Sequence, residues 1–310
     1  MILTVTLNLA LDVTYEVPRV DWDGVNRVGA VHRRAGGKGV NVARVLAALG
    51  HDTLVTGLAG GRTGHAVEAD LRSAPLRHAL TPVAGDSRTT LTITEPHTHP
   101  HEPGRSGRTA LFNEPGPHVT SGELTAFTRR YEKLLSGAGA VVLAGSLPRG
   151  VPAGFYATLA AIAAARGVPA VVDADGEPLR HAAEGRPAVV KPNADELARA
   201  VPGGTLTEAA GALRERGAGA VVVSMGADGL LAVTGEGTFR ARMPYTVHGN
   251  PTGAGDALVA GLALALVERT PWPDTLRRAA ALGAAAVATP VAGEIDPDVY
   301  ADIHPQITVS

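Results

Sequence analysis

Residues 249–258 read GNPTGAGDAL, and this stretch decides how the rest of the chain is interpreted. Three small residues, Gly253, Ala254 and Gly255, lead into one carboxylate, Asp256, and a long apolar run follows at once. A glycine-rich turn before a helix leaves backbone N–H groups unpaired at the positive end of the helix dipole, so it favours an anion. A carboxylate beside a phosphate is useful where a hydroxyl attacks that phosphate, because the hydroxyl proton must be accepted. The alternative is that Asp256 only caps the helix.

The bulk composition restricts the class of protein. The chain has 310 residues, 45% of them hydrophobic, which suits one large α/β domain with or without a small accessory piece. Lys and Arg number 28, Asp and Glu number 30, and the net charge is −2. We therefore expect no nucleic-acid partner and no binding to an anionic membrane. The absence of cysteine excludes thiolate catalysis and Cys-based metal sites, and it fits a reducing cytoplasm.

Two apolar stretches raise the question of targeting or membrane insertion. The N-terminal stretch MILTVTLNLALD lacks a basic region and a cleavage site, so we expect a buried first strand and not a signal peptide. The apolar run after Asp256 is too short to span a bilayer. The expectation is a soluble, cytoplasmic protein.

Short β-branched runs alternate with helical patterns along most of the chain. This alternation predicts a mostly parallel sheet covered by helices, with ligands at the carboxyl ends of the strands. The expected strands are 2–7, 53–58, 140–144, 170–173, 188–191 and 220–224. The expected helices are 40–49, 63–73, 121–135, 152–166, 194–200 and 207–216.

Two stretches interrupt this rhythm. Residues 12–34 and 87–113 carry alternating strand-like patterns with no helix between them, and they are too polar for core strands. They predict a small β-sheet lid over one edge of a main domain, which comprises 1–11, 35–86 and 114–310. Because an exposed sheet has edges that favour covering, we expect a homodimer through the lid.

A histidine-rich loop, 96–104, joins the second pair of lid strands. His97, His99 and His101 alternate, so on a strand they would share one face. The loop is either a solvated tip or a metal site, and no fourth ligand is obvious.

Four further stretches carry polar groups beside predicted strand ends. AGGKGVNVA at 35–43 is neither a Walker A loop nor a dinucleotide fingerprint, and its Lys38 and Asn41 favour a polar ligand over a plain tight turn. VVKPNADEL at 189–197 fits a capping box, or a lysine for nucleotide phosphates with an Asn/Glu pair for Mg²⁺. VVVSMGADG at 221–229 fits a hairpin turn or a phosphate contact. Asp12, after the first strand, either binds sugar hydroxyls or caps a turn.

The order of these motifs along the chain is similar to that of a known protein family. Asp12, GGKGVNVARVLAALG, GSLPRGVP at 145–152, KPNADEL, VSMGADG and PTGAGDA follow one another at suitable intervals over nearly the whole chain. The sequence resembles the ribokinase-like, or PfkB-type, carbohydrate kinases, and within them the 1-phosphofructokinase and tagatose-6-phosphate kinase branch. The resemblance implies a ribokinase-like three-layer α/β/α sandwich with a β lid that often pairs between subunits, and it implies ATP and Mg²⁺.

The resemblance also implies a role for each motif residue. The implied catalytic residues are Asp256 as general base, with Gly253, Ala254 and Gly255 as the anion hole. The implied sugar- and sugar-phosphate-binding residues are Asp12, Gly37, Lys38, Asn41, Arg88 and Arg27. The implied nucleotide-binding residues are Lys191, Asn193, Ser224, Gly226 and Gly229, with Glu196 holding Mg²⁺ through water. Either arginine is otherwise an ordinary solvated charge.

Some positions depart from the pattern of the branch. Leu9 stands where proline is usual, Thr90 where asparagine is usual, and Asn250-Pro251 is an unusual lead-in to TGAGD. The departures bear on which sugar is used, because position 90 is expected close to the sugar.

The expected function is ATP-dependent phosphorylation of a hydroxyl on a ketohexose monophosphate, such as fructose 1-phosphate or tagatose 6-phosphate, with fructose 6-phosphate also open. One alternative is a kinase of an unphosphorylated sugar or a nucleoside, which would leave the two arginines without a role. Another is a non-catalytic nucleotide-binding regulatory protein, which the presence of Asp256 disfavours. A Rossmann-type oxidoreductase is disfavoured because no GxGxxG follows the first strand.

Overall fold

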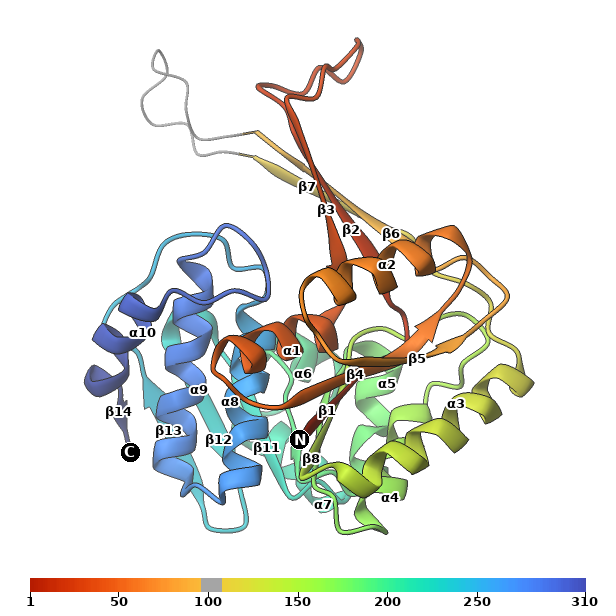
Figure 1. Cartoon of the computed structure of the whole chain (residues 1–310). Coiled ribbons are helices and arrows are strands. Elements are labelled where there is room, and N and C mark those ends of the chain that lie inside the picture. Colours follow the sequence, from red (N-terminus) through yellow and green to blue (C-terminus); the bar gives the residue numbers. More distant parts are fainter. Residues whose placement is uncertain (96–107) are drawn as a thin grey trace.

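A ten-stranded sheet forms the centre of the molecule in the computed structural model, which describes residues 1–95 and 108–310 (Figure 1). The strand order is β14-β13-β12-β11-β10-β9-β8-β1-β4-β5. The strands from β11 through β5 in this order run parallel, while β12, β13 and β14 extend one edge antiparallel. The bounds are β1 Ile2–Thr6, β4 Thr53–Ala59, β5 His78–Pro82, β8 Ala140–Ala144, β9 Ala170–Asp173, β10 Val189–Val190, β11 Ala220–Ser224, β12 Leu230–Val233, β13 Thr238–Arg242 and β14 Thr308–Val309.

Helices cover both faces of this sheet, because its central strands are apolar on both sides. Successive residues of β1 point to opposite faces, so Leu3 joins one core cluster and Ile2 the other. The first face packs against α3 Ser121–Leu134, α4 Phe155–Ala164, α5 Gly176–Ala182, α6 Ala194–Ala200 and α7 Leu206–Glu215. The second packs against α1 Lys38–Ala48, α8 Ala254–Glu268, α9 Trp272–Val287 and α10 Pro297–Ile303. Helix α2, Gly61–Ser73, packs beside α1. The predicted α/β/α layering is confirmed.

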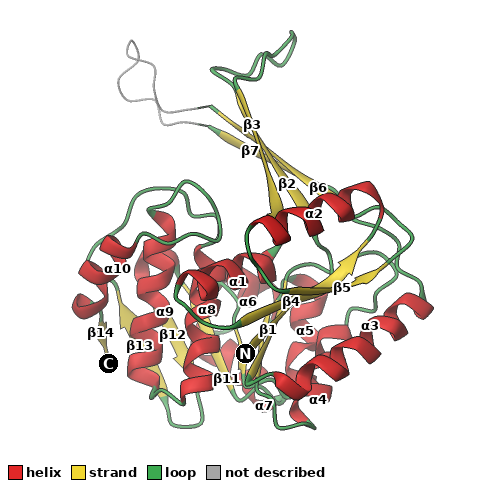
Figure 2. Cartoon of the chain, in the orientation of Figure 1, coloured by secondary structure: helices red, strands yellow, loops and turns green. Residues whose placement is uncertain are grey.

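A second, four-stranded sheet extends away from this body (Figure 2). Its order is β3-β2-β6-β7, with β2 Ala10–Glu16, β3 Ala30–Gly36, β6 Arg88–Thr94 and β7 Thr109–Asn113. Strands β2 and β6 run parallel, and β3 and β7 add antiparallel on the outside. We call these four strands the lid sheet.

The lid sheet differs in detail from the sequence-based expectation. Strands β2 and β3 each extend two residues beyond the predicted limits of 12–34, so that β2 begins at Ala10 and β3 ends at Gly36. The division into domains therefore stays a prediction. The predicted metal site of loop 96–104 lies outside the described residues.

The sequence-based element bounds are close to those observed. Strands 140–144, 170–173 and 220–224 and helix 194–200 are confirmed residue for residue. Helix α4 begins later than predicted, at Phe155, because Pro152 to Gly154 form a turn. No helix among the described residues has the length and apolar character needed to cross a membrane.

A pair of valine truncations tests the core. Val142 on β8 is completely buried, whereas Val267 near the end of α8 is 44% exposed. Val142→Ala removes two buried carbons and leaves a cavity, so we expect a loss of about 1.5–3 kcal/mol in the free energy of unfolding. Val267→Ala is the matched control and should change it by less than about 0.5 kcal/mol. Urea unfolding followed by circular dichroism measures both, and equal values would contradict the assignment of the core.

Candidate active site

The candidate site lies where the carboxyl ends of the parallel strands meet the first turns of α1 and α8. A cleft of about 880 Å³ opens along this edge. Its walls come from the ends of β1 and β8, the start of α1, the lid sheet and the start of α5. The lining side chains used below are those of Asn8, Lys38, Arg88, Asn113, Glu114, Ser146, Arg149, Asp175, Glu177 and Glu196.

Asp256 occupies the first turn of α8, and it does not cap that helix. The residue before the helix is Gly253, at φ 88°, and no side chain caps the end, so the capping alternative is wrong. Asp256 is only 6% exposed, and its Oδ2 accepts a hydrogen bond from Asn41 Nδ2 at 2.8 Å. A side chain at position 253 would be strained by that φ and would approach Ala292 to 2.8 Å. The glycine is therefore required by both the turn and its neighbour.

The backbone of this turn fits the predicted anion hole in part. The N–H of Ala254 donates to the Pro251 carbonyl at 3.2 Å, so it is engaged within the turn. The N–H groups of Gly253 and Gly255 have no acceptor among the described residues. A β-carbon on Gly255 would lie 3.6 Å from Lys191 Nζ, which places that cation beside the turn. Two free N–H groups and one ammonium thus converge where an anion is expected.

A buried charge cluster lies next to Asp256. Asp173, at the end of β9, is 1% exposed. Its Oδ1 accepts from Lys38 Nζ at 3.1 Å and from Lys191 Nζ at 3.2 Å. Its Oδ2 is buried without a hydrogen-bond partner among the described residues. The cluster joins α1, β9 and the segment after β10, and it holds two lysines against one full negative charge.

The cluster sets the protonation of its members. Burial works to raise the pKa of Asp173, but the two lysines outweigh it and hold that pKa below its ordinary value. Burial likewise works to lower the pKa of Lys38, but Asp173, Asp256 and Glu196 together outweigh it, so the pKa is raised and Lys38 stays charged. Burial also raises the pKa of Asp256 to about 7, with Asp173 adding to the rise and Lys38, Asn41 and Lys191 opposing it. A carboxyl with a pKa near neutrality is suited to accepting and releasing a proton.

The base of the lid sheet carries a second group of polar side chains, of which Arg88 and Asn113 line the cleft. Asp12 on β2 stands opposite Thr90 on β6 in the register, and Thr90 stands opposite Asn113 on β7. Arg88 donates from Nε to the Asn8 carbonyl at 3.1 Å and from Nη1 to Thr90 Oγ1 and Asn113 Oδ1, both at 3.3 Å. Burial raises the pKa of Asp12, and the hydrogen bond from Thr90 works against that rise.

The glycines of the AGGKG stretch make room for these groups. A β-carbon on Gly36 would overlap the Asp12 carboxylate, and one on Gly37, which has φ 111°, would lie 2.6 Å from Thr6 Cγ2. Helix α1 begins directly after Gly37, two residues earlier than predicted, so Lys38 sits on its first turn. This start lets Lys38 reach Asp173.

The capping box predicted for residues 189–197 and the turn predicted for residues 221–229 are both present. Asn193 and Glu196 form a capping box on α6, with Asn193 Oδ1 accepting from the Glu196 N–H and Glu196 Oε2 from the Asn193 N–H, both at 2.8 Å. Glu196 nevertheless lines the cleft. Gly226 and Gly229 form a turn between β11 and β12, with φ of 60° and 90°, and Ser224 is the last residue of β11. Their nucleotide roles stay predictions.

Arg27 is not brought to the cleft within one chain. It is exposed on the loop between β2 and β3 and does not line the cleft. Conversely, Asn8 and Arg149 line the cleft, and Asp173 lies in the charge cluster beside Asp256, without having been singled out from the sequence. Asp173 ends a strand in the sequence VVD, and a carboxylate at the end of a buried run is the one signal that could have found it.

Comparison with known proteins agrees with this arrangement. The model of the pfkB family carbohydrate kinases matches residues 6–298. Phosphofructokinase-2 from Escherichia coli, in a structure with potassium, is 30% identical with a TM-score of 0.88, and 98% of each chain is covered. A protein described as a possible 1-phosphofructokinase from Thermotoga maritima is 28% identical with a TM-score of 0.84, covering 100% of this chain and 98% of that one. Ribokinase from Arabidopsis thaliana, at 20% identity and a TM-score of 0.75 over 98% of each chain, shares the fold.

The fold and these matches define the class of protein, an ATP-dependent sugar kinase with a ribokinase-like fold. The family model spans nearly the whole chain, so the chain belongs to the pfkB family of carbohydrate kinases.

The pKa of Asp256 generates a pH prediction. If this carboxylate accepts a proton in the reaction it must be ionised, so kcat/KM should rise with pH through about 7 and level off above it. Asn41→Ala removes a hydrogen bond that favours the charged form, so the rising limb should move up by roughly one pH unit. The profile is measured by coupled ADP release from about pH 5 to about pH 9. A limb that stays in place in the Asn41 variant would contradict the prediction.

Proposed function

We propose that this chain transfers the γ-phosphate of ATP to a hydroxyl of a ketohexose monophosphate, with fructose 1-phosphate and tagatose 6-phosphate as the first candidates and fructose 6-phosphate as the third. One observation carries the proposal: Asp256 is buried on the first turn of α8, oriented by Asn41, beside free N–H groups, the buried Lys191 and the partly exposed Lys38. This is the arrangement that in-line transfer to an alcohol requires.

The proposed mechanism assigns a task to each group. Asp256 Oδ accepts the proton of the sugar hydroxyl as that oxygen attacks the γ-phosphorus. The N–H groups of Gly253 and Gly255, with Lys191 beside them, stabilise the charge on the transferring phosphoryl group. Asp12 binds sugar hydroxyls from the lid side, and Asn41 keeps Asp256 aligned.

Magnesium fits the residues present, although only as an ion shared with phosphates. Among the described residues no three His, Asp or Glu side chains gather into a site that would hold a metal alone. Mg²⁺ usually keeps several waters and takes one or two carboxylates together with substrate phosphates. Glu196 uses Oε2 in its capping box and lines the cleft, so it is the proposed carboxylate, acting through water. When bound, the ion neutralises charge on the nucleotide phosphates.

The choice of a phosphorylated acceptor rests on Arg88. It lines the cleft and is held by three neutral acceptors without an ion pair to any described residue. Asp12 and Glu114 act on Arg88 electrostatically, but neither forms a direct ion pair with it, so its guanidinium can still pair with a phosphate. Escherichia coli phosphofructokinase-2, 29% identical to this chain in its structure with fructose 6-phosphate, is described as binding that sugar. An unphosphorylated sugar or a nucleoside remains the second candidate, and a non-catalytic nucleotide-binding protein the third.

We also propose that two chains pair through the lid sheet. Of the large apolar side chains exposed on the described surface, most lie on this sheet or on the loop between β2 and β3: Trp22, Val25, Val28, Val31, Leu111 and Phe112. A second copy would cover them, and the role predicted for Arg27 requires such a partner, because one chain does not bring it to the cleft. Light scattering should give the mass of a dimer, and a monomer at assay concentration would contradict this pairing. The cytoplasmic location stays a prediction.

The proposed function is tested by coupled ADP release with Mg-ATP over a panel of acceptors. The panel contains fructose 1-phosphate, fructose 6-phosphate, tagatose 6-phosphate, free hexoses, ribose and adenosine. Turnover on one phosphosugar supports the proposal. Turnover only on an unphosphorylated acceptor would keep the kinase and overturn the substrate class.

Asp256→Asn tests the general base. The amide cannot accept the hydroxyl proton, so we expect kcat to fall by about 10²–10⁴-fold while the dissociation constant for ATP stays within about threefold. Because the side chain is isosteric, the urea midpoint should hold. A variant that keeps a near-normal rate would remove Asp256 from the mechanism.

A further inference from the structure

The cleft continues past the lid sheet toward the start of α5, and a second arginine lines this extension. Arg149 stands in the connection between β8 and α4, within the motif GSLPRGVP, to which the sequence assigned no separate role. Its backbone is fixed: the Arg149 carbonyl accepts from the Val119 N–H at 2.8 Å, and Gly150 behind it has φ 85°.

The guanidinium of Arg149, in contrast, is almost uncommitted. Its one contact is a long hydrogen bond, 3.4 Å, from Nη2 to the Gly116 carbonyl, and it forms no ion pair with any described residue. Most of its N–H groups are therefore available to a ligand in the cleft.

Four carboxylates share the cleft walls, but each is already engaged. Glu114 accepts from the Thr89 N–H at 2.7 Å, and Asp175 accepts from Arg199 at 3.1 Å. Glu177 pairs with Arg180, and Glu196 belongs to its capping box. Lys38 is bound to Asp173. Among the described residues that line the cleft, Arg88 and Arg149 are thus the cations that form no direct ion pair, although Asp12 and Glu114 act electrostatically on Arg88.

Asn8 contacts Arg88 directly and the segment that Arg149 contacts. Its carbonyl accepts from Arg88 Nε at 3.1 Å, and its Nδ2 donates to the Pro115 carbonyl at 3.3 Å. The next residue, Gly116, is the one that Arg149 contacts. Asn8 is 4% exposed and also donates to Ser146 Oγ at 3.0 Å, at the start of the Arg149 turn. Both arginines are consequently placed from the end of β1.

The cleft includes the acceptor side of the site, together with Glu196, the residue proposed to hold Mg²⁺. No residue of the α8 turn or of the turn between β11 and β12 lines it, whereas the lid sheet and the start of α1 do. An anion held there is therefore distinct from the phosphates expected near Gly253 and Lys191.

We propose that Arg149 is the second arm, with Arg88, of a subsite for the phosphate that the acceptor sugar already carries. This inference rests on the proposed function and deepens it, because it names the chain's own second phosphate contact. In this arrangement Arg27 is not needed to complete the subsite within one chain.

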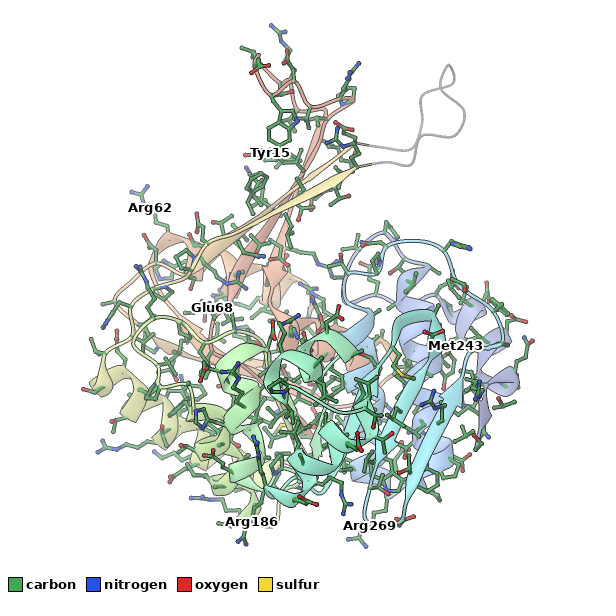
Figure 3. All side chains as sticks on the ribbon, turned by 180° about the vertical axis from the view of Figure 1, so that it is seen from behind. Tyr15, Arg62, Glu68, Arg186, Met243 and Arg269 are labelled. Carbon is green, nitrogen blue, oxygen red and sulfur yellow. The ribbon has the colours of Figure 1, made fainter. Side chains whose placement is uncertain are left out.

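The test is the binding and kinetics of Arg149→Ala, beside Arg149→Lys and Arg88→Ala. Arg62→Ala is the matched control, because Arg62 is exposed and projects outward from the body (Figure 3). We expect Arg149→Ala to raise KM for the phosphosugar, and its dissociation constant in calorimetry, by about tenfold to a hundredfold, with KM for ATP within about twofold. Arg149→Lys keeps the charge without the fork and should be intermediate.

The other outcomes distinguish a failure of this inference from a failure of the proposed function. If the wild type turns over a phosphosugar and Arg149→Ala leaves KM and the dissociation constant unchanged, the inference fails while the proposed function stands. If only unphosphorylated sugars react, both the phosphate subsite and the substrate class fail. If no acceptor on the panel reacts, the proposed function fails, and calorimetry with fructose 1-phosphate and inorganic phosphate still decides the role of Arg149: equal binding to both proteins overturns it. An unchanged urea midpoint for Arg149→Ala excludes misfolding as the cause.

Discussion

The contact of Asp173 with two lysines is the interaction on which the rest of the site depends. It joins the end of β9 to the first turn of α1 and to Lys191 after β10, three segments that come from distant parts of the chain. Removing water from one carboxylate and two ammonium groups is costly, and the ion pairs must offset that cost. Asp173 supplies one charge against two, and Asp256 and Glu196 also act on Lys38. Lys191 lies beside Gly255, where it can meet an anion at the α8 turn.

The same cluster explains why Asp256 differs from an ordinary carboxylate. Its burial opposes ionisation, and the nearby Asp173 opposes it further, while Lys38 and Asn41 support it. The effects that oppose ionisation prevail and raise the pKa to about 7, so the charged and neutral forms are about equally populated at neutral pH. A residue on the outside of α8 would have no such balance, because water would dominate its surroundings. Position on the inner side of the first turn, set by Gly253, is therefore as important as the identity of the side chain.

Much of this arrangement was predictable from the sequence, for local reasons. The glycines before α1 and α8 indicate tight turns that lead into helices, so Lys38, Asn41 and Asp256 could be placed near helix starts. Other features depend on contacts that no local pattern encodes. Asp173 lies 135 residues from Lys38, and its strand end carries no glycine or proline signal. Arg27 and Arg88 look alike in sequence, yet one is on an exposed loop and the other at the base of the lid sheet. The antiparallel strands β12 to β14 were missed because all three are short, with four, five and two residues, and because β13 and β14 are partly polar.

Lys38 and Lys191 also affect how a phosphate would change the pKa of Asp256 in the proposed phosphoryl transfer. A nucleotide phosphate carries negative charge, and negative charge beside a carboxyl raises its pKa. Asp256 already has a pKa near 7 without a ligand, so an uncompensated phosphate would protonate it and remove the base. Lys191 lies between the α8 turn and Asp173, and Lys38 acts on Asp256 from the α1 side, so both cations oppose that rise. In the proposed mechanism the lysines therefore do more than attract the nucleotide: they keep the pKa of Asp256 lower than it would be without them.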